Sequence, residues 1–287
     1  MSAPEFQPQI DKAAVLLEAL PYLQNFRGET FLIKVGGSAM DDPDKVRALL
    51  RDIVFLEVAG INPVLVHGGG KAISAAMAEA GLEPEFRNGL RVTSDEAMDL
   101  VEKTLSGTIN PGLVRSIEEF GGTALGVAGN EVFVGERVPE LGRVGTVVDF
   151  DLGKVEAAIS TEVIPVVSPV ASEVETQLPL NVNADLAASA LAAKLKAAKL
   201  VYLSDVIGLC EDKNDPSTLI TSVRSDQIET MIEDGTIAGG MIPKVRSSVD
   251  ALNAGVGKVH MIDGRIRHSL LLEIYTESGI GTEIVTD

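Results

Sequence analysis

The chain has 287 residues and a formal net charge of −18, because 42 acidic side chains oppose 24 basic ones. Such a surface repels phosphate backbones and anionic lipid headgroups, so we expect no binding to nucleic acid or to membranes. Hydrophobic residues make up 45% of the chain, which excludes an acidic disordered protein and suffices for the core of one large or two small domains.

The chain has few residues of the kinds that bind metals. The single cysteine, Cys210, excludes a disulfide framework and a cysteine-rich zinc site, and the three histidines lack metal-ligand spacing. We therefore predict no metal site made of protein side chains. The chain shows no signal-peptide pattern and no apolar run near the roughly 18 residues of a membrane helix, so we expect a soluble cytoplasmic protein.

Short apolar runs alternate with longer helical patterns along the chain. The predicted strands are 31–35, 63–67, 163–168, 199–204 and 258–263, and the predicted helices are 44–59, 71–80, 94–105, 184–197 and 244–253. This alternation indicates an α/β fold, an open and mainly parallel central sheet sandwiched by helices in three layers. Residues 121–150, rich in Gly and Val, predict hairpins. The amphipathic segment 11–20 predicts a terminal helix that serves either packing or an oligomer contact.

Glycines directly follow two of the predicted strands. Lys34 lies in the first strand, which ends at Gly36 and Gly37, and three glycines at 68–70 follow the second strand. Glycines let a ligand approach backbone N–H groups, and the helix start that follows attracts anions. The spacing fits neither a P-loop nor a dinucleotide fingerprint. Two glycine-rich strand ends in consecutive βα units nevertheless predict one shared anionic site at the carboxyl edge of the sheet. Lys34 either meets that anion or reaches solvent from a strand end.

Three further motifs place charged groups beside this edge. Arg91 carries a planar fork that suits a carboxylate or phosphate, although taken alone it could form a surface ion pair. Asp185 stands at a predicted helix start, where it either caps the helix or holds nearby lysines. Lys244 also stands at a helix start, an unfavourable place for a cation unless an anionic ligand is present. Phosphoryl transfer needs this kind of positioned positive charge more than covalent help, so the sequence predicts a phosphotransferase.

Five motifs together resemble the amino acid kinase family across nearly the whole chain. They are Lys-Val-Gly-Gly-Ser-Ala-Met (34–40), His-Gly-Gly-Gly (67–70), Asn-Gly-Leu-Arg-Val-Thr (88–93), Asn-Val-Asn-Ala-Asp (181–185) and Gly-Gly-Met-Ile-Pro-Lys (239–244). Within the family, the set is most similar to enzymes that use ATP to phosphorylate the γ-carboxylate of N-acetyl-L-glutamate, the second step of arginine biosynthesis. This implies ATP with Mg²⁺ carried mainly by the nucleotide. It implies no general base, since the carboxylate is already ionised at pH 7.

The resemblance also implies roles for individual residues. Lys34 and Lys244 would stabilise the transferring phosphoryl group, and Asp185 would organise both lysines. The substrate would contact Gly36, Gly37, Gly69, Gly70, Arg91 and Asn181. The nucleotide would contact Asp205, Val206, Ile207, Gly208, Leu209, Cys210, Thr236, Ile237 and Ala238.

The two ends of the chain resemble the arginine-sensitive branch of the family. In that branch N-terminal helices interlace to join three dimers into a homohexamer, and arginine binds between this helix and the C-terminal loop. The resemblance implies an inhibitory L-arginine site at Tyr22, His268, Glu273, Gly279 and Gly281, with Glu273 on the guanidinium. Ordinary packing of both ends is the alternative. A nitrogen-regulatory signalling protein is a further partner that the resemblance admits.

The resemblance divides the chain into an oligomerisation and regulatory helix (1–25), a lobe for the substrate and the dimer interface (26–180), and a lobe for ATP and the arginine site (181–287). Val35, Ser38 and Lys71 replace the family's commoner Tyr, Asn and Pro, which affects substrate fit more than reaction class. The alternatives are kinases of aspartate, carrier-linked aminoadipate or carbamate, and a non-catalytic amino-acid sensor.

Overall fold

The structure, a computed structural model, describes residues 6–87, 89–276 and 278–286. The strands of its main sheet are β1 (Thr30–Val35), β2 (Asn62–His67), β5 (Ala124–Val127), β8 (Ile164–Val167), β11 (Lys199–Ser204), β14 (Ser222–Arg224), β15 (Lys258–Asp263) and β16 (Thr282–Val285). They lie in the order β14-β16-β15-β11-β1-β2-β8-β5, and the pairing between β15 and β16 is antiparallel while the others are parallel.

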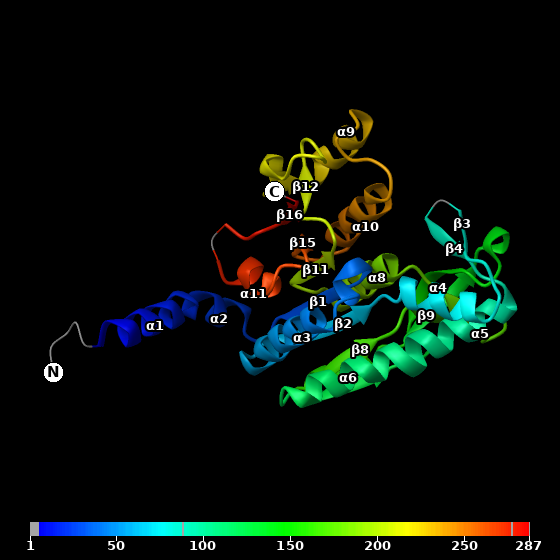
Figure 1. Ribbon diagram of the computed structural model, residues 1–287, viewed down its shortest axis with the longest axis horizontal. Helices are drawn as coiled ribbons and strands as arrows, with labels where there is room; N and C mark the ends of the chain where they lie inside the picture. Colours follow the sequence, from blue (N-terminus) through cyan, green and yellow to red (C-terminus); the bar gives the residue numbers. More distant parts are fainter. Residues whose placement is uncertain (1–5, 88, 277, 287) are drawn as a thin grey trace.

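The helices are α1 (Gln7–Glu18), α2 (Leu20–Phe26), α3 (Pro43–Val58), α4 (Gly70–Glu79), α5 (Asp95–Thr104), α6 (Asn110–Glu119), α7 (Gly153–Ser160), α8 (Ala184–Leu195), α9 (Ile228–Glu233), α10 (Met241–Asn253) and α11 (Ser269–Ile274). Figure 1 shows α3 and α6 on one side of the sheet and α8 and α10 on the other. No helix in the described part of the chain is both long and apolar enough to cross a membrane.

Smaller sheets lie at the edges of this body. One has the order β10-β9-β6-β7, with β6 (Phe133–Arg137), β7 (Gly145–Phe150), β9 (Val170–Glu173) and β10 (Pro179–Asn181). Two hairpins pair β3 (Glu85–Arg87) with β4 (Leu90–Val92) and β12 (Leu209–Cys210) with β13 (Leu219–Ile220). The hairpins predicted within 121–150 are present as β6 and β7, whereas β5 joins the main sheet as an edge strand.

Alternating side chains of the central strands enter two separate apolar cores. On β1, Leu32 packs into the core under α8 and α10, while Phe31 and Ile33 pack into the core under α3 and α6. Both faces of these strands are therefore buried, which explains why their sequences are continuously apolar rather than alternating. The predicted α/β fold with a mainly parallel, helix-covered sheet is confirmed. All five predicted strands and all five predicted helices are present within about three residues of their expected ends.

The helix predicted at 94–105 is followed directly by further helical structure that was not predicted. After α5, a π-helical turn over Leu105–Ile109 leads directly into α6. Pro111 lies in the first turn of α6. A proline inside a regular helix loses a hydrogen bond and collides with the preceding turn. The wider π turn absorbs that conflict and keeps α5 and α6 continuous.

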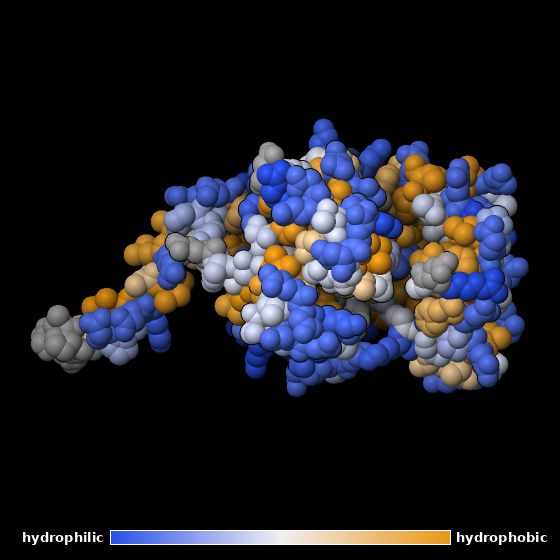
Figure 2. All heavy atoms as spheres, turned by 90° about the horizontal axis from the view of Figure 1, so that it is seen from above, coloured by the Kyte–Doolittle hydropathy of each residue, from blue (hydrophilic) through white to orange (hydrophobic). Residues whose placement is uncertain are grey.

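The N-terminal segment forms two helices rather than one. They meet at Ala19, and α1 has no buried residue. Val15, Leu16 and Leu17 are 65–72% exposed. Figures 1 and 2 show this helix projecting from the body with apolar side chains on its surface.

The N-cap of α3 gives a test of the local structure. Asp42 Oδ1 accepts hydrogen bonds from the N–H groups of Asp44 (3.0 Å) and Lys45 (3.4 Å). Asp42→Ala leaves both donors without a side-chain acceptor, so we expect the free energy of unfolding to fall by about 1 kcal/mol. Urea denaturation measures this change, and Asp42→Ser, which keeps an acceptor, should lose less. Equal losses in the two variants would contradict the capping role.

Candidate functional site

The carboxylate of Asp185 joins two lysines from different parts of the chain. Its Oδ1 lies 2.7 Å from Nζ of Lys34 on β1, and its Oδ2 lies 3.5 Å from Nζ of Lys244 in the first turn of α10. The lysine side chains are 9% and 11% exposed. Burial alone would raise the pKa of Asp185, but the two ammonium groups outweigh it and lower that pKa below its ordinary value. Asp185 is therefore ionised at pH 7 and keeps both cations at the carboxyl edge of the sheet.

Two neighbours fix the position of Asp185. Asn183 caps α8, its Oδ1 accepting hydrogen bonds from the N–H groups of Asp185 (2.9 Å) and Leu186 (3.2 Å). The hydroxyl of Tyr202 donates to the carbonyl of Asp185 at 3.2 Å. The ring of Tyr202 lies 5.5 Å from Lys244 Nζ, a cation–π contact. Burial raises the pKa of Tyr202, so its hydroxyl stays protonated and can donate.

The glycines after β1 and β2 leave room that larger residues would occupy. A Cβ atom on Gly36 would lie 2.2 Å from Nζ of Lys34, so a side chain there would displace the ammonium. Gly37 has a φ of +62°, which favours glycine. The N–H of Gly68 donates to the carbonyl of Val35 at 2.7 Å. This bond ties the two glycine loops together at one edge of the sheet.

A cavity of about 210 Å³ lies over these loops. Its lining includes Lys34, Gly37, Gly69, Gly70, Arg91, Asn181 and Asp185. On one wall, the side-chain amide of Asn181 donates to Oγ1 of the buried Thr93 at 3.0 Å. The predicted substrate residues are thus brought together on the cavity wall, with the exception of Gly36, which lies beneath Lys34. Asn88, which belongs to the same motif as Arg91, lies outside the described residues.

Arg91 is a buried cation at this wall, with 8% exposure. Its guanidinium donates to the carbonyl of Gly70 (2.8 Å) and to Ser74 Oγ (2.7 Å), and lies 4.7 Å from the ring centre of Phe86. Among the described residues, no carboxylate forms an ion pair with it. Burial lowers the pKa of Arg91, but the guanidinium remains charged at pH 7. A buried cation without an anionic partner favours an anionic ligand.

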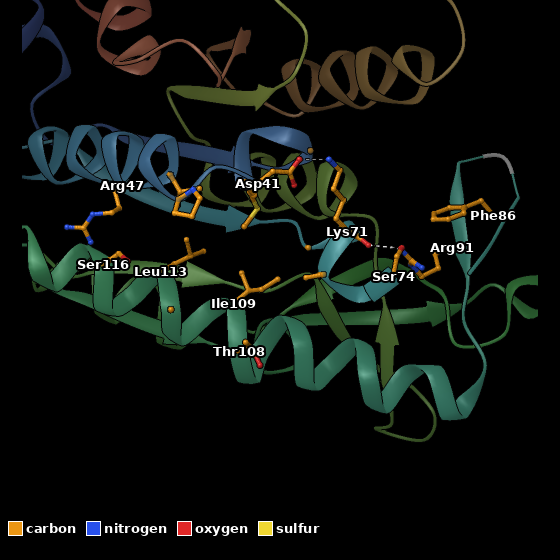
Figure 3. A pocket seen from close by; sticks show the side chains of 18 residues that line it. Asp41, Arg47, Lys71, Ser74, Phe86, Arg91, Thr108, Ile109, Leu113 and Ser116 are labelled. Carbon is orange, nitrogen blue, oxygen red and sulfur yellow. Dashed lines mark hydrogen bonds and ion pairs between the residues drawn. The ribbon is translucent and has the colours of Figure 1, made fainter. Parts of the chain in front are cut away.

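A larger groove of about 750 Å³ adjoins the cavity and shares Gly37, Gly69 and Arg91 with it. Figure 3 shows the groove between α3 and α6, with Lys71 directed toward Asp41 at its rim. These two side chains form an exposed ion pair. Lys71, which departs from the commoner family residue, is therefore exposed to solvent at the rim of the groove, where it pairs with Asp41.

The predicted nucleotide residues form two groups, one after β11 and one between α9 and α10. Leu209 and Ile237 are buried in the same apolar core, so only their backbone groups can meet a ligand. Asp205 lies beside the first glycine loop, where a Cβ atom on Gly37 would be 3.6 Å from Asp205 Oδ1. The described residues contain no cluster of three or more His, Cys, Asp or Glu side chains that could hold a metal ion.

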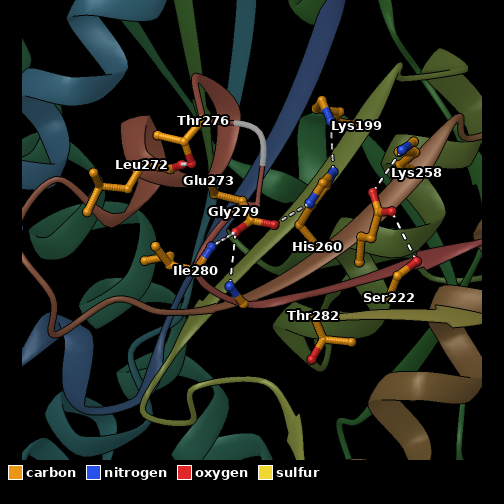
Figure 4. A network of polar contacts seen from close by, with 12 residues as sticks. Lys199, Ser222, Lys258, His260, Leu272, Glu273, Thr276, Gly279, Ile280 and Thr282 are labelled. Atoms are coloured by element: carbon orange, nitrogen blue, oxygen red, sulfur yellow. Dashed lines mark hydrogen bonds and ion pairs between the residues drawn. The ribbon is translucent and has the colours of Figure 1, made fainter. Parts of the chain in front are cut away.

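A second polar network is buried beside the C-terminal loop (Figure 4). Lys199 Nζ lies 2.8 Å from His260 Nε2, and His260 Nδ1 lies 2.6 Å from Glu273 Oε1. Glu273 Oε2 accepts hydrogen bonds from the N–H groups of Ile280 (2.7 Å) and Gly281 (3.1 Å). Burial lowers the pKa of Lys199 to about 8, so this lysine is still mainly charged at pH 7.

The residues predicted to bind arginine divide between this network and its surroundings. Gly279 touches the network, since a Cβ atom there would lie 2.7 Å from Glu273 Oε2. Tyr22 on α2 packs edge-on against Tyr275, with ring centres 6.2 Å apart. His268 lies outside the network.

His268 is instead bound to α3, where its Nδ1 lies 2.6 Å from Asp52 Oδ1. The histidine that contacts Glu273 is His260, which the sequence pattern did not single out. His260 and His268 both lie within 13 residues of Glu273 in the sequence. Only the pairing of β15 with its neighbouring strands shows that His260 is the one that contacts Glu273.

A model of the amino acid kinase family matches residues 29–263. The chain belongs to this family. It is 58% identical to an acetylglutamate kinase of Akkermansia muciniphila, over 97% of each chain. It is 44% identical to an acetylglutamate kinase of Aquifex aeolicus, over 97% of this chain and 99% of the relative.

Solved structures show the same fold. An N-acetylglutamate synthase from Neisseria gonorrhoeae, complexed with coenzyme A and N-acetyl-glutamate, has a TM-score of 0.85 and 25% identity over 96% of this chain. The match covers 63% of the synthase, so this chain spans less than two thirds of that protein. A carbamate kinase from Giardia lamblia has a TM-score of 0.67 and 21% identity over 91% of this chain and 99% of that one, a likeness of fold alone.

Some residues of this amino acid kinase site could not be found from sequence motifs. Tyr202 is the aromatic residue in an otherwise mainly aliphatic strand. This polar hydroxyl within a buried strand could have indicated a role in the site, but Tyr202 belongs to none of the five motifs. Phe86 and Ser74 carry no local signal, because their contacts with Arg91 depend on how α4 and the β3–β4 hairpin pack.

Gly36→Ala tests the space that this kinase keeps for the Lys34 ammonium. The backbone of Gly36 is extended (φ −167°), so alanine causes no backbone strain there, and the atom that its methyl group would meet is Nζ of Lys34. The ammonium would have to leave Asp185, so turnover should fall at least ~100-fold, as when one electrostatic group is removed. A steady-state kinase assay measures this.

The matched control is Gly153→Ala at the start of α7, where the new Cβ atom would meet only Asp151 Oδ1, at 3.3 Å. This variant should keep its activity. Normal turnover in Gly36→Ala would show that the position of the Lys34 ammonium is unimportant.

Proposed function

We propose that the chain transfers the γ-phosphoryl group of ATP to the γ-carboxylate of N-acetyl-L-glutamate, giving N-acetylglutamyl 5-phosphate and ADP. The observation that carries the proposal is the convergence of Lys34 and Lys244 on Asp185 above two glycine loops. Curated relatives named acetylglutamate kinase, 41–58% identical over 95–97% of this chain, support the choice of substrate.

The residues of the site act by position and charge. A γ-carboxylate oxygen attacks the γ-phosphorus, and the bond from that phosphorus to the bridging oxygen of ADP breaks. Negative charge on the transferring group is stabilised by Lys34, Lys244 and the N–H groups of the glycine loops. Asp185 keeps the two ammonium groups together and apart from solvent. No side chain has to remove a proton, because the attacking carboxylate is ionised at pH 7.

The substrate is held by the wall of the smaller cavity. The guanidinium of Arg91, which has no carboxylate partner among the described residues, would bind the α-carboxylate. Asn181 would hold the acylated amino group. Arg91 belongs to the proposed substrate lobe (26–180), whereas Asn181 is the first residue of the proposed ATP lobe (181–287).

The nucleotide would lie against the residues after β11 and before α10, within the proposed ATP lobe. The buried Leu209 and Ile237 can offer only backbone groups there, and the described residues offer no cluster of three or more acidic, cysteine or imidazole ligands. They fit a Mg²⁺ ion carried by the ATP phosphates, which neutralises part of their charge.

A substrate panel tests the reaction directly. ADP release should be fastest with acetylglutamate and much slower with glutamate, aspartate or carbamate, because only the first presents an α-carboxylate, an acyl group and a γ-carboxylate together. Absence of a response to acetylglutamate would contradict the proposal, and a preference for carbamate or aspartate would support a related kinase. No turnover with any acceptor would favour an amino-acid sensor.

The same assay tests the two lysines. Lys34→Ala and Lys244→Ala should each lower kcat at least ~100-fold, since each removes a cation from the transferring group. Lys154→Ala is the control, because this lysine forms a half-exposed ion pair with Glu131. Near-normal turnover in either active-site variant would refute its role.

We also propose that L-arginine inhibits the enzyme at the C-terminal network. The α2 helix packs onto the network through Phe26, whose ring centre lies 5.2 Å from Lys199 Nζ. The buried hydroxyl of Tyr275, beside Tyr22, has no hydrogen-bond partner among the described residues. Glu273 accepts three hydrogen bonds, and a carboxylate has about four acceptor sites, so one remains for a guanidinium. A synthase structure complexed with coenzyme A and L-arginine, with a TM-score of 0.80 and 25% identity, supports this ligand.

The exposed apolar side chains of α1 favour an assembly. The described structure buries no residue of α1, and exposed apolar surfaces of this kind usually mark contacts with other chains. We propose that α1 interlaces with its copy in a neighbouring dimer to form a hexamer of three dimers.

Deletion of residues 1–25 tests both regulatory proposals. The shortened enzyme should keep its turnover, lose inhibition by arginine and form dimers, because it lacks α1 and Tyr22. Light scattering and arginine titration during turnover measure these changes. A shortened enzyme that remains hexameric would contradict the interlaced helices, and one that is still fully inhibited would contradict the arginine site.

A further inference from the structure

The imidazole of His67 lies directly beneath the glycine loop that follows β2, and phosphoryl transfer as described above makes no use of it. Its exposure is 0%. Nδ1 lies 3.0 Å from the carbonyl oxygen of Gly68, and Nε2 lies 3.3 Å from Nδ2 of Asn110. Asn110 is itself buried, with 3% exposure, at the point where the π turn meets α6.

These contacts determine where the imidazole carries its proton. Asn110 Nδ2 donates one hydrogen to the carbonyl of Val166 at 2.8 Å, which fixes the orientation of the amide. The second hydrogen of that amide faces His67 Nε2, so Nε2 must be an acceptor. The proton is therefore on Nδ1, which donates it to the carbonyl of Gly68. The ring is neutral and held in one tautomer.

The environment also keeps the ring neutral. Burial, and to a smaller extent the nearby ammonium of Lys34, lower the pKa of His67 to about 4, although the hydrogen bond to the Gly68 carbonyl opposes this shift. A second proton would have to point from Nε2 at the amide hydrogens of Asn110. The same neutral donor is therefore present throughout the pH range in which an enzyme of this kind is assayed.

The carbonyl that His67 holds belongs to the same peptide plane as the N–H of Gly69. In a trans peptide the C=O and N–H point in opposite directions, and the chain has no cis peptide bond in its described part. A hydrogen bond that pulls the Gly68 carbonyl toward His67 therefore directs the Gly69 N–H away from His67 and toward the cavity side of the loop.

The π turn holds the next residue from the other side. A Cβ atom on Gly69 would lie 2.7 Å from side-chain atoms of both Leu105 and Ile109, so these two side chains pack directly against the loop. The same turn thus supplies the apolar contacts on Gly69 and, one residue later, the amide of Asn110.

We propose that His67 and Asn110 are positioning residues for phosphoryl transfer, in which Asn110 fixes the tautomer of His67 and His67 aims the backbone N–H of Gly69 at the transferring group. This rests on the proposed kinase reaction, since it assigns the N–H a phosphoryl ligand. It gives the π turn between α5 and α6 a function, because the turn places Asn110 under the strand end.

Two substitutions separate the two contacts of the imidazole. In His67→Asn the amide nitrogen can occupy the place of Nδ1 and still donate to Gly68. In His67→Gln the amide oxygen can reach the place of Nε2 and still accept from Asn110, but the donor to Gly68 is lost. Both remove ring volume, so thermal unfolding of both variants shows how much of any effect is structural.

We expect His67→Asn to keep kcat within about 3-fold of the parent enzyme. His67→Gln should lose roughly 10- to 100-fold in kcat with KM values for ATP and acetylglutamate nearly unchanged, because a misdirected donor weakens the transition state more than substrate binding. Equal losses in the two variants, or losses that follow their thermal stability, would overturn the positioning role.

The tautomer of His67 can be measured by NMR, without an activity assay. With ring nitrogens of histidine labelled with ¹⁵N, and His67→Asn used to assign its signals, we expect His67 to show a protonated Nδ1 and a bare Nε2 at pH 7. A protonated Nε2 would overturn the proposal whatever the activity of the two variants. If the enzyme is inactive on acetylglutamate while the Nδ1–H form is found, the proposed substrate is wrong. The hydrogen bond from His67 to the Gly68 carbonyl is then still supported.

Discussion

The contact of one carboxylate with two ammonium groups organises the whole site. Lys34 comes from the central strand and Lys244 from a helix more than 200 residues later in the sequence, and their cations would repel each other without Asp185 between them. The surroundings serve this contact. Asn183 begins the helix that carries the carboxylate, Tyr202 holds its carbonyl, and the missing side chain at Gly36 leaves space for one ammonium.

The charge of the chain explains why this arrangement is needed. Both proposed substrates are anions, and the protein around them has a net charge of −18. Its attraction for phosphate must therefore come from a few cations and backbone N–H groups gathered in one place with little solvent between them. Burial strengthens their effect, and Asp185 offsets part of the cost of burying two lysines. Arg91 is a further buried cation, and no carboxylate among the described residues forms an ion pair with it.

Sequence patterns could predict what depends on local composition. The buried strands are apolar throughout because both of their faces are covered, and the glycine loops stand out because nothing else explains three adjacent glycines. Sequence patterns could not predict contacts between distant parts of the chain. The sequence patterns did not predict the π turn before Pro111, and Phe86 contacts Arg91 only through the packing of a hairpin. Strand pairing decides whether His260 or His268 contacts Glu273, and the residues next to each histidine in the sequence do not indicate which one it is.

The central claim is that Asp185 presents two ammonium groups to one phosphoryl group. A crystal structure of the enzyme with ADP, aluminium fluoride and acetylglutamate tests it most directly, because the fluoride mimics the transferring group. Our account predicts that Nζ of Lys34 and Nζ of Lys244 both lie within hydrogen-bonding distance of the fluoride ligands while Asp185 still contacts both lysines. A complex in which either lysine points away from the fluoride, with the nucleotide and acetylglutamate in place, would contradict it.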